Sequence, residues 1–284
     1  MLGYGMHAAC QTELVQQLRT RGFIEEPRLV EAMTRVDRAA FLPPNTAEPY
    51  SNNPIKVSEC SSVSTPQLHA QVLQLLAPAF TSSASPRSFL DFGCGTGYLA
   101  SVAAEIGVDR VIASESDETA HEAARKNLEA YTTVKVMKLF PEESYSSEPF
   151  TALYVSPYFS SKDEALKFCS QWLRPDGLAV CSYADCSNGL DEQLALIEKK
   201  SDGSLNVTPQ FRVAGGALRE DRSVDGSKQA VRNGPEIREL NKRLLLGWRE
   251  RFEGIHGRRP TRSDMFADPK AADAFRLFSG TQSY

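Results

Sequence analysis

The segment "SFLDFGCGTGYLA", residues 88–100, places three glycines at alternate positions directly after an apolar run. The apolar run predicts a buried strand, and the apolar residues after the glycines predict a helix. Glycines between a strand and a helix let the backbone approach a ligand closely, and the first turn of the helix offers unpaired N–H groups. The segment therefore predicts a strand, turn and helix that hold a nucleoside-like ligand.

The spacing of the glycines narrows the choice of ligand. A dinucleotide-binding turn has the order Gly-x-Gly-x-x-Gly, and its third glycine, counted from Gly93, would fall on Tyr98. Glu115 follows Gly97 by 18 residues at the end of the next apolar run, where a carboxylate can accept hydrogen bonds from both ribose hydroxyls. This pairing resembles class I S-adenosylmethionine-dependent methyltransferases, with a tight turn that binds nothing as the alternative.

Short apolar runs alternate with amphipathic segments through the middle of the chain. Thr65 is suited to cap a helix that begins at Pro66. This alternation predicts an α/β fold with a Rossmann-like, doubly wound and mostly parallel sheet. The strands are expected at 88–92, 110–114, 134–140, 150–156 and 178–184, with one or two added strands at 204–215, and the helices near 97–106, 117–130 and 161–173.

Composition excludes several other classes of protein. The 284 residues carry a net charge of -4, whereas a nucleic-acid binder generally needs a basic surface. The six cysteines include no Cys-x-x-Cys pair, so we expect reduced thiols and no metal site. The first residues lack a signal-peptide pattern, and no window is apolar enough for a membrane helix. We therefore expect a cytoplasmic, or else nuclear, protein with no nucleic-acid or membrane partner.

A second stretch, "EPYSNNPIKVSECSSVSTPQLHAQVLQLL" at 48–76, resembles the signature of protein-L-isoaspartate O-methyltransferases. That family carries a similar Pro-Tyr loop and then Thr-Ile-Ser-Ala-Pro-His-Met-His-Ala before a Leu-rich helix. The segments "VDRAAFLPP", "FLDFGCGTGYLASVAA", "WLRPDGLAV" and "KKSDGSLNV" resemble further motifs of the family, in the family's order. The resemblance covers residues 10–215 and implies S-adenosyl-L-methionine as the cofactor.

The resemblance also implies a reaction. Enzymes of this family methylate the free carboxylate of an isoaspartyl residue in a damaged protein, and the ester then collapses to a succinimide that can reopen as normal aspartate. The carboxylate is already ionised at neutral pH, so the protein needs to align the reacting atoms and exclude water instead of supplying a strong base. The resemblance implies Ser64 as the catalytic residue, an orienting donor to this carboxylate. A second helix-cap residue is the alternative role for Ser64.

The expected cofactor-binding residues come from the glycine turn and from the resemblance. His69 matches a cofactor-contacting position of the family, and a simple packing contact is its alternative. Asp91 is expected to brace the glycine turn by accepting backbone N–H groups. The complete set expected to bind S-adenosyl-L-methionine is Ser62, Val63, His69, Asp91, Gly93, Cys94, Gly95, Gly97 and Glu115.

Three substitutions separate the chain from the family pattern. Gln67 stands where the family has a histidine, and "LFPEE" at 139–143 replaces a Gly-Asp-Gly that ends the third strand. "SPYF" at 156–159 replaces a Gly-Ala-Ala turn beside the active site, where Tyr158 and Phe159 could narrow the substrate groove. Two alternatives therefore stand beside the repair enzyme: a catalytically inactive methyltransferase-like adaptor, and a methyltransferase for another carboxylate or a small molecule.

Four segments are expected along the chain. Residues 1–60 form an N-terminal helical cap and substrate-side loop, residues 61–214 the methyltransferase core, residues 215–235 a mobile linker, and residues 236–284 a C-terminal helical extension. The extension has apolar residues at helical spacing and more basic than acidic residues. It either binds a protein partner at 236–280 or packs a helix pair on the parent domain.

Overall fold

The computed structural model describes residues 6–58, 61–83, 86–138, 148–159, 161–184, 192–214 and 217–219, and the single residues 249, 253, 257 and 258. The chain divides into two compact units, Met1–Asp221 and Arg222–Tyr284. Of the expected linker, only the strand Ala217–Arg219 is described. The expected C-terminal helices and partner site lie outside the described residues, apart from those four single positions.

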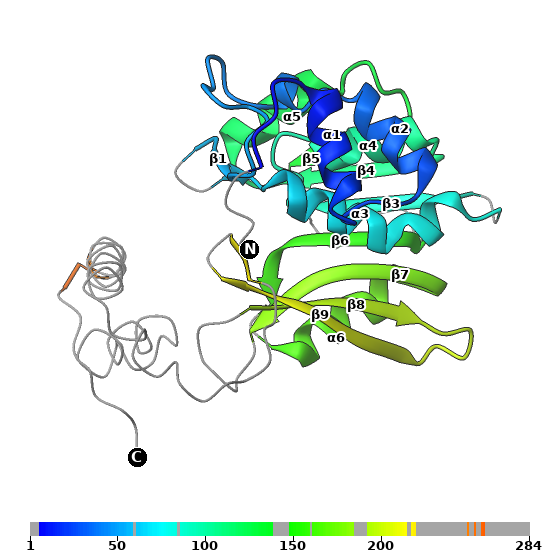
Figure 1. Cartoon of the computed structure of the whole chain (residues 1–284). Coiled ribbons are helices and arrows are strands. Elements are labelled where there is room, and N and C mark those ends of the chain that lie inside the picture. The colour runs from blue at the N-terminus through cyan, green and yellow to red at the C-terminus, as the bar shows by residue number, and fades with distance from the viewer. Residues whose placement is uncertain are drawn as a thin grey trace, which may run out of the picture. The chain divides into compact units, whose positions relative to one another are not determined.

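An eight-stranded sheet forms the centre of the first unit, in the strand order β10-β9-β8-β7-β6-β3-β4-β5 (Figure 1). Five strands pair in parallel: β3 (Ser88–Phe92), β4 (Arg110–Glu115), β5 (Val134–Lys138), β6 (Phe150–Phe159) and β7 (Leu173–Ala184). Three add in antiparallel fashion: β8 (Glu192–Lys199), β9 (Leu205–Ala214) and β10 (Ala217–Arg219). The predicted mostly parallel α/β sheet is confirmed.

Helices cover both faces of this sheet. The helices are α1 (Gln11–Thr20), α2 (Pro27–Arg35), α3 (Pro66–Thr81), α4 (Tyr98–Ile106), α5 (Glu118–Leu128) and α6 (Lys162–Trp172), with a 3-10 helix η1 (Arg38–Phe41) after α2. One buried cluster packs the five helices α1 through α5 on one face of the sheet. A second cluster packs α6 on the opposite face. Neighbouring residues of β3 divide between them, Phe89 in the first and Leu90 in the second. Strands buried on both faces give continuous apolar runs, as in these strands.

The start of α3 follows the predicted capping pattern. The Thr65 hydroxyl accepts a hydrogen bond from the Leu68 N–H at 3.2 Å, and Pro66 occupies the first helical position. Val72 and Leu76 have no exposed surface, so the apolar stripe of the helix packs into the core. The prediction of a capped amphipathic helix at this position is confirmed.

A separate two-stranded sheet and strand β8 of the main sheet were not expected from the sequence. The two-residue strands β1 (Ile55–Lys56) and β2 (Ser62–Val63) pair with each other, and strands this short leave no periodic signal in the sequence. Strand β8 also lacks alternation, because consecutive residues Leu194 and Ala195 are both buried. Both strands and buried helices produce such apolar runs, so β8 is not predicted from its sequence.

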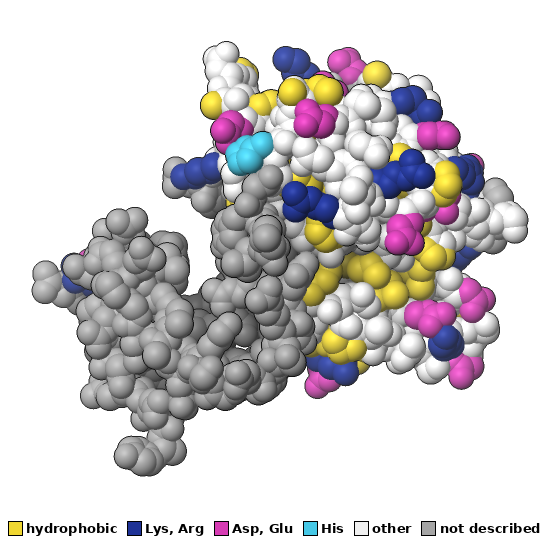
Figure 2. Space-filling view, in the orientation of Figure 1, with side chains coloured by type: hydrophobic (Ala, Val, Ile, Leu, Met, Phe, Trp, Pro, Cys, Tyr) yellow, Lys and Arg dark blue, Asp and Glu magenta, His cyan; other side chains and the backbone are white. Residues whose placement is uncertain are grey.

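The described residues carry charges of both signs on their surface (Figure 2) and include four cysteines. On the face drawn in Figure 2, basic and acidic side chains of the described residues are interspersed, without a continuous basic surface. The four cysteines in the described residues are free: Cys10, Cys94, Cys169 and Cys181. Among the described residues no helix combines the length and apolar character needed to cross a membrane.

Candidate functional site

A pocket lies at the carboxyl end of β3, where this strand pairs with β4 on one side and β6 on the other. In an open α/β sheet the crevice beyond the strand ends, at the point where the strand order reverses, is the usual ligand site. The pocket brings together eight of the ten residues predicted for the site. They are Ser62, Val63, Ser64, His69, Asp91, Gly93, Cys94 and Gly95.

The three glycines of the turn have different surroundings. All three have positive φ angles, +79° at Gly93, +56° at Gly95 and +92° at Gly97, which a glycine adopts without strain. A Cβ atom at Gly93 would lie 2.7 Å from Pro157 Cδ, and one at Gly97 would lie 2.6 Å from Leu128 Cδ1. A Cβ at Gly95 would meet nothing within 4 Å. Gly97 therefore serves helix packing and does not line the pocket, whereas Gly95 faces open space.

Glu115 holds the glycine turn in place. Its Oε2 accepts a hydrogen bond from the Gly95 N–H at 2.8 Å, and its Oε1 accepts from the N–H groups of Ser116 and Asp117 at 2.7 and 2.8 Å. Glu115 itself is buried and does not line the pocket. A carboxylate has about four acceptor positions, and the Ser116 hydroxyl occupies the fourth through a long bond to Oε1 of 3.4 Å, so this is the bond that a further donor could replace.

Asp91 has the opposite surroundings, and its predicted bracing role is wrong. The side chain lines the pocket, and within the described residues neither carboxyl oxygen has a hydrogen-bond partner. Burial raises the pKa of Asp91 from its ordinary 3.8 to about 8, and the charge of Glu115 acts in the same direction. The nearby Ala100 N–H opposes this pKa shift in part, although it does not reach hydrogen-bond geometry. Asp91 is thus a buried acid available to a ligand.

Ser64 also lines the pocket and lies between β2 and α3. The side chain is half-buried and immediately precedes the helix cap Thr65. The Ser64 carbonyl accepts a hydrogen bond from Arg38 Nη2 at 2.8 Å. The first N–H groups of α3 are already bonded, Gln67 N–H to Asn52 Oδ1 and Leu68 N–H to Thr65 Oγ1, so the helix favours negative charge here through its dipole. This wall of the pocket is therefore suited to an anion.

His69 occupies the first turn of α3 and also lines the pocket. Its ring stacks on Tyr98, with the ring centroids 5.2 Å apart and the planes at 29°. Nδ1 of His69 lies 3.4 Å from Arg38 Nη1. Burial and the Arg38 charge hold the pKa of His69 well below its ordinary 6.5. His69 is therefore neutral at physiological pH.

Comparison with known proteins identifies the family of this pocket. Residues 9–213 match the family model of protein-L-isoaspartate(D-aspartate) O-methyltransferase, PCMT. The chain belongs to this family. A PCMT relative from Methanopyrus kandleri is 30% identical over 199 residues, which cover 68% of this chain and 83% of that protein. Another from Aeropyrum pernix is 35% identical over 119 residues, covering 41% of this chain and 44% of that protein.

A solved PCMT structure has the same fold. The structure, from Plasmodium falciparum in complex with S-adenosyl-L-homocysteine, covers 75% of this chain and 100% of its own, with a TM-score of 0.62. The two sequences are 19% identical, so this likeness concerns the fold alone.

The PCMT pocket also contains residues that were not among those predicted for the site. In the sequence, Tyr98 served only to exclude a dinucleotide-binding turn, in which this position is a glycine. In the structure the ring of Tyr98 stacks on the ring of His69 and lines the pocket. The carboxyl end of β6 contributes further residues because β6, distant in sequence, is the neighbour of β3. For Thr96, Tyr98 and Leu99, the available sequence signal was their position in or directly after the glycine turn. The additional lining residues are Thr96, Tyr98, Leu99, Tyr154 and Ser156.

The described departures from the PCMT pattern lie in or beside the pocket. Gln67 is buried and exchanges two hydrogen bonds with Asn52, both at 3.0 Å, so it fastens the preceding loop to α3. Tyr158 is 39% exposed, and Phe159 packs on Phe168 with ring centroids 5.4 Å apart. Gln67, Tyr158 and Phe159 do not line the pocket, whereas Ser156, the first residue of the replaced turn, does. The segment 139–143 lies outside the described residues.

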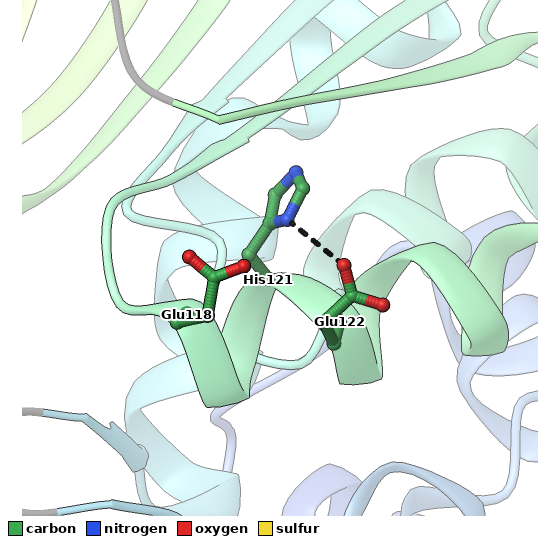
Figure 3. A group of neighbouring side chains, drawn as sticks. All are labelled: Glu118, His121 and Glu122. Carbon is green, nitrogen blue, oxygen red and sulfur yellow. Dashed lines mark ion pairs between the residues drawn. The ribbon is translucent and has the colours of Figure 1, made fainter.

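A second group of polar side chains lies on the first turns of α5 (Figure 3). Glu118, His121 and Glu122 bring one potential metal-ligand atom each to within 4.8 Å of the others. Both carboxylates already have a basic partner, since Glu118 pairs with Lys138 and Glu122 pairs with Arg125 at 3.2 Å. We therefore assign no metal to this group.

Proposed function

We propose that this chain transfers the methyl group of S-adenosyl-L-methionine to the free carboxylate of isoaspartyl residues in damaged proteins. The observation that carries the proposal is the unpaired, buried carboxyl of Asp91 in a pocket that residues at the N-terminus of α3 also line. The carboxyl suits a cationic methyl donor, and the positive end of the α3 dipole suits an anionic acceptor. The four cysteines of the described residues are free, which supports a reducing compartment, and we place the protein in the cytoplasm.

The residues present fit the cofactor. S-adenosyl-L-methionine carries an ammonium and a sulfonium, and its ammonium offers three N–H donors to acceptors that lack a partner. Within the described residues Asp91 has two such oxygens, and the buried Thr96 hydroxyl is a third orphaned polar atom of the pocket. Gly95 leaves room for close approach of the ligand to the backbone. Asp91 and Thr96 would hold the amino acid end, and Glu115 would accept from the ribose by exchange of its long bond with the Ser116 hydroxyl.

The acceptor side needs orientation more than proton transfer. An isoaspartyl carboxylate is already ionised at neutral pH, so it can attack the methyl carbon without a general base. Ser64 would donate a hydrogen bond that fixes one carboxylate oxygen, and the N-terminus of α3 would favour its negative charge. The neutral His69 adds no positive charge that would repel the sulfonium. The cofactor, when bound, supplies the electrophilic methyl group.

Transfer of labelled methyl from S-adenosyl-L-methionine to an isoaspartyl peptide tests the proposal. The matched control is the same peptide with normal aspartate, and an active enzyme of this family runs alongside. Selective labelling of the isoaspartyl peptide is the expected result. Equal, weak labelling of both peptides would indicate another acceptor. No labelling beside an active control would overturn the enzyme assignment in favour of the adaptor.

A further inference from the structure

A buried arginine lies directly behind the acceptor side of the pocket. Arg38 begins the 3-10 helix η1 and has no exposed surface. It does not itself line the pocket. No ion pair joins the Arg38 guanidinium to any carboxylate among the described residues. A fully buried cation without an acidic partner is unusual, because desolvation of an isolated charge is unfavourable.

The Arg38 side chain is held by three neutral acceptors. Nε donates to the Pro49 carbonyl at 3.2 Å, Nη2 donates to the Ser64 carbonyl at 2.8 Å, and Nη1 lies 3.4 Å from His69 Nδ1. Its backbone N–H donates to Gln11 Oε1 at 3.1 Å. The planar guanidinium presents its donors in a fixed fork, so it sets the relative orientation of the groups that it binds.

The first consequence concerns Ser64. This residue lies outside any helix or strand, between β2 and α3, so regular secondary structure does not fix its peptide group. The bond from Arg38 turns the Ser64 carbonyl toward the interior, while the residue also lines the pocket. Arg38 thereby fixes the backbone that carries the Ser64 hydroxyl.

The second consequence concerns the tautomer of His69. A guanidinium can only donate, so Nδ1 of the neutral imidazole acts as the acceptor and the ring proton resides on Nε2. The structure gives Nε2 no partner within the described residues, and the ring lines the pocket. His69 is therefore held with its donor nitrogen available to a bound molecule.

We propose that Arg38 is a positioning residue for methyl transfer: through its fork it fixes the Ser64 backbone and holds His69 in the Nε2–H tautomer. The inference rests on the proposed function for its kinetic part, because Ser64 matters only if a carboxylate is methylated. It extends that function to a residue that touches neither cofactor nor substrate.

Kinetics of Arg38→Lys and Arg38→Met provide the first test. Arg38→Met removes the charge and the fork, so we expect kcat with the isoaspartyl peptide to fall about 10- to 100-fold, as for misplaced reacting groups. Arg38→Lys keeps the charge without the fork and should recover only a small part of this loss. The matched control is Arg35→Met on α2, because Arg35 pairs with the Glu105 carboxylate away from the pocket. Full activity of Arg38→Met would overturn the proposal.

A double-mutant cycle with Ser64→Ala separates positioning from general support of the fold. If Arg38 acts by placing the Ser64 hydroxyl, Arg38→Met should reduce kcat much less in the Ser64→Ala background than in the parent chain. Independent, multiplicative losses would contradict this role. Circular dichroism and thermal unfolding of each variant show whether it is folded.

The tautomer of His69 tests the inference without any activity measurement. The chain has four histidines, so ¹⁵N-histidine labelling and a His69→Gln variant assign the ring signals. We expect the Nε2–H form in the parent chain and a mixture of tautomers in Arg38→Lys. An Nδ1–H form in the parent chain would overturn the inference, even if Arg38→Met does not fold. If the parent chain transfers no methyl group, the proposed function fails, whereas this spectrum still decides the role of Arg38.

Discussion

At the scale of single residues, Glu115 braces the glycine turn, the role that was expected of Asp91. Glu115 accepts three backbone N–H groups and fixes the glycine turn, whereas Asp91 has no hydrogen-bond partner within the described residues. Both acids were predicted to lie at strand ends. Which of the two side chains reaches the glycine turn depends on side-chain direction. Asp91 pairs with Ala113, two residues before Glu115, so both acids point to the same face of the sheet and the strand pattern does not show which of them reaches the turn.

Asp91→Asn should stabilise the free protein and weaken cofactor binding. The folded pKa of Asp91, about 8, lies above its ordinary 3.8, so ionisation of Asp91 increasingly destabilises the fold as pH rises from 3.8 through 8. Above this range the asparagine variant should gain about 1–3 kcal/mol, with a Tm higher by about 2–4 °C per kcal/mol. Below the lower value the two proteins should differ little in this respect.

Thermal unfolding at the two ends of this pH range, with titration of S-adenosyl-L-homocysteine, measures both effects. The loss of the carboxylate should weaken ligand binding about tenfold or more, because the ligand ammonium loses a charged acceptor. A variant with reduced Tm at alkaline pH and unchanged ligand affinity would contradict the assignment of Asp91 to the cofactor.

Ser64→Ala should slow methyl transfer with little change in cofactor affinity. A hydrogen bond to a charged group contributes about 1.5–3 kcal/mol, which corresponds to a loss of about 10- to 150-fold in kcat/KM. The matched control is Ser83→Ala, an exposed serine just beyond the C-terminus of the same helix. Steady-state kinetics with an isoaspartyl peptide decides the matter, and an unchanged rate would exclude Ser64 from catalysis.

At the scale of elements, the glycine turn both packs against α5 and leaves room for the ligand, and single substitutions can separate these two functions. Alanine at any positive-φ position of the turn costs about 1–2 kcal/mol of stability. At Gly97 the added Cβ also displaces Leu128, so Gly97→Ala should lose about 2–4 kcal/mol in total. At Gly95 the space is open, so Gly95→Ala should lose only the backbone part.

Cofactor affinity should be reduced more by Gly95→Ala than by Gly97→Ala, the reverse of their effects on stability. Gly95→Ala fills space in the pocket and should weaken S-adenosyl-L-homocysteine about tenfold or more, because backbone approach to the ligand is blocked. Gly203→Ala is the matched control, since Gly203 has a φ of +86° and open space but lies in the β8–β9 turn. Urea unfolding and ligand titration measure the two quantities. Equal effects of Gly95→Ala and Gly203→Ala on binding would contradict this division.

Local signals allowed most elements of the core to be predicted from the sequence. The cap Thr65 with Pro66 placed the start of α3, and the apolar runs placed β3, β4 and β6 close to their observed bounds. The signal failed where residues are too few, as in β1, or buried on both faces, as in β8. The contribution of β6 to the pocket depends on strand order, which no local pattern encodes.

At the scale of the whole molecule, the pocket residues all lie within the unit Met1–Asp221. Truncation after Asp221 should therefore leave the Tm of this unit and its affinity for S-adenosyl-L-homocysteine close to those of the full chain. Methyl transfer to a small isoaspartyl peptide should also persist. Thermal unfolding, ligand titration and peptide methylation of both chains check these expectations.

The outcomes of truncation separate the remaining interpretations of the C-terminal segment. Retained binding with lost methyl transfer would show that residues 222–284 contribute to the acceptor side. Loss of the fold would contradict the predicted boundary after the methyltransferase core.

The sequence predicted the family and the cofactor from motifs that are contiguous. It missed Arg38 as a functional residue, because its contact with His69 joins positions 31 residues apart.

The position of β3 between β4 and β6 has a consequence for the growing polypeptide. During synthesis β4 emerges soon after the glycine turn, whereas β6 and Pro157, which packs against Gly93, emerge much later. Distant strand pairing forms slowly, and domains generally fold as units while the chain leaves the ribosome. The nascent chain therefore acquires a complete cofactor pocket only after β6 has left the ribosome, so translation arrested before that point should release a chain that cannot retain the ligand.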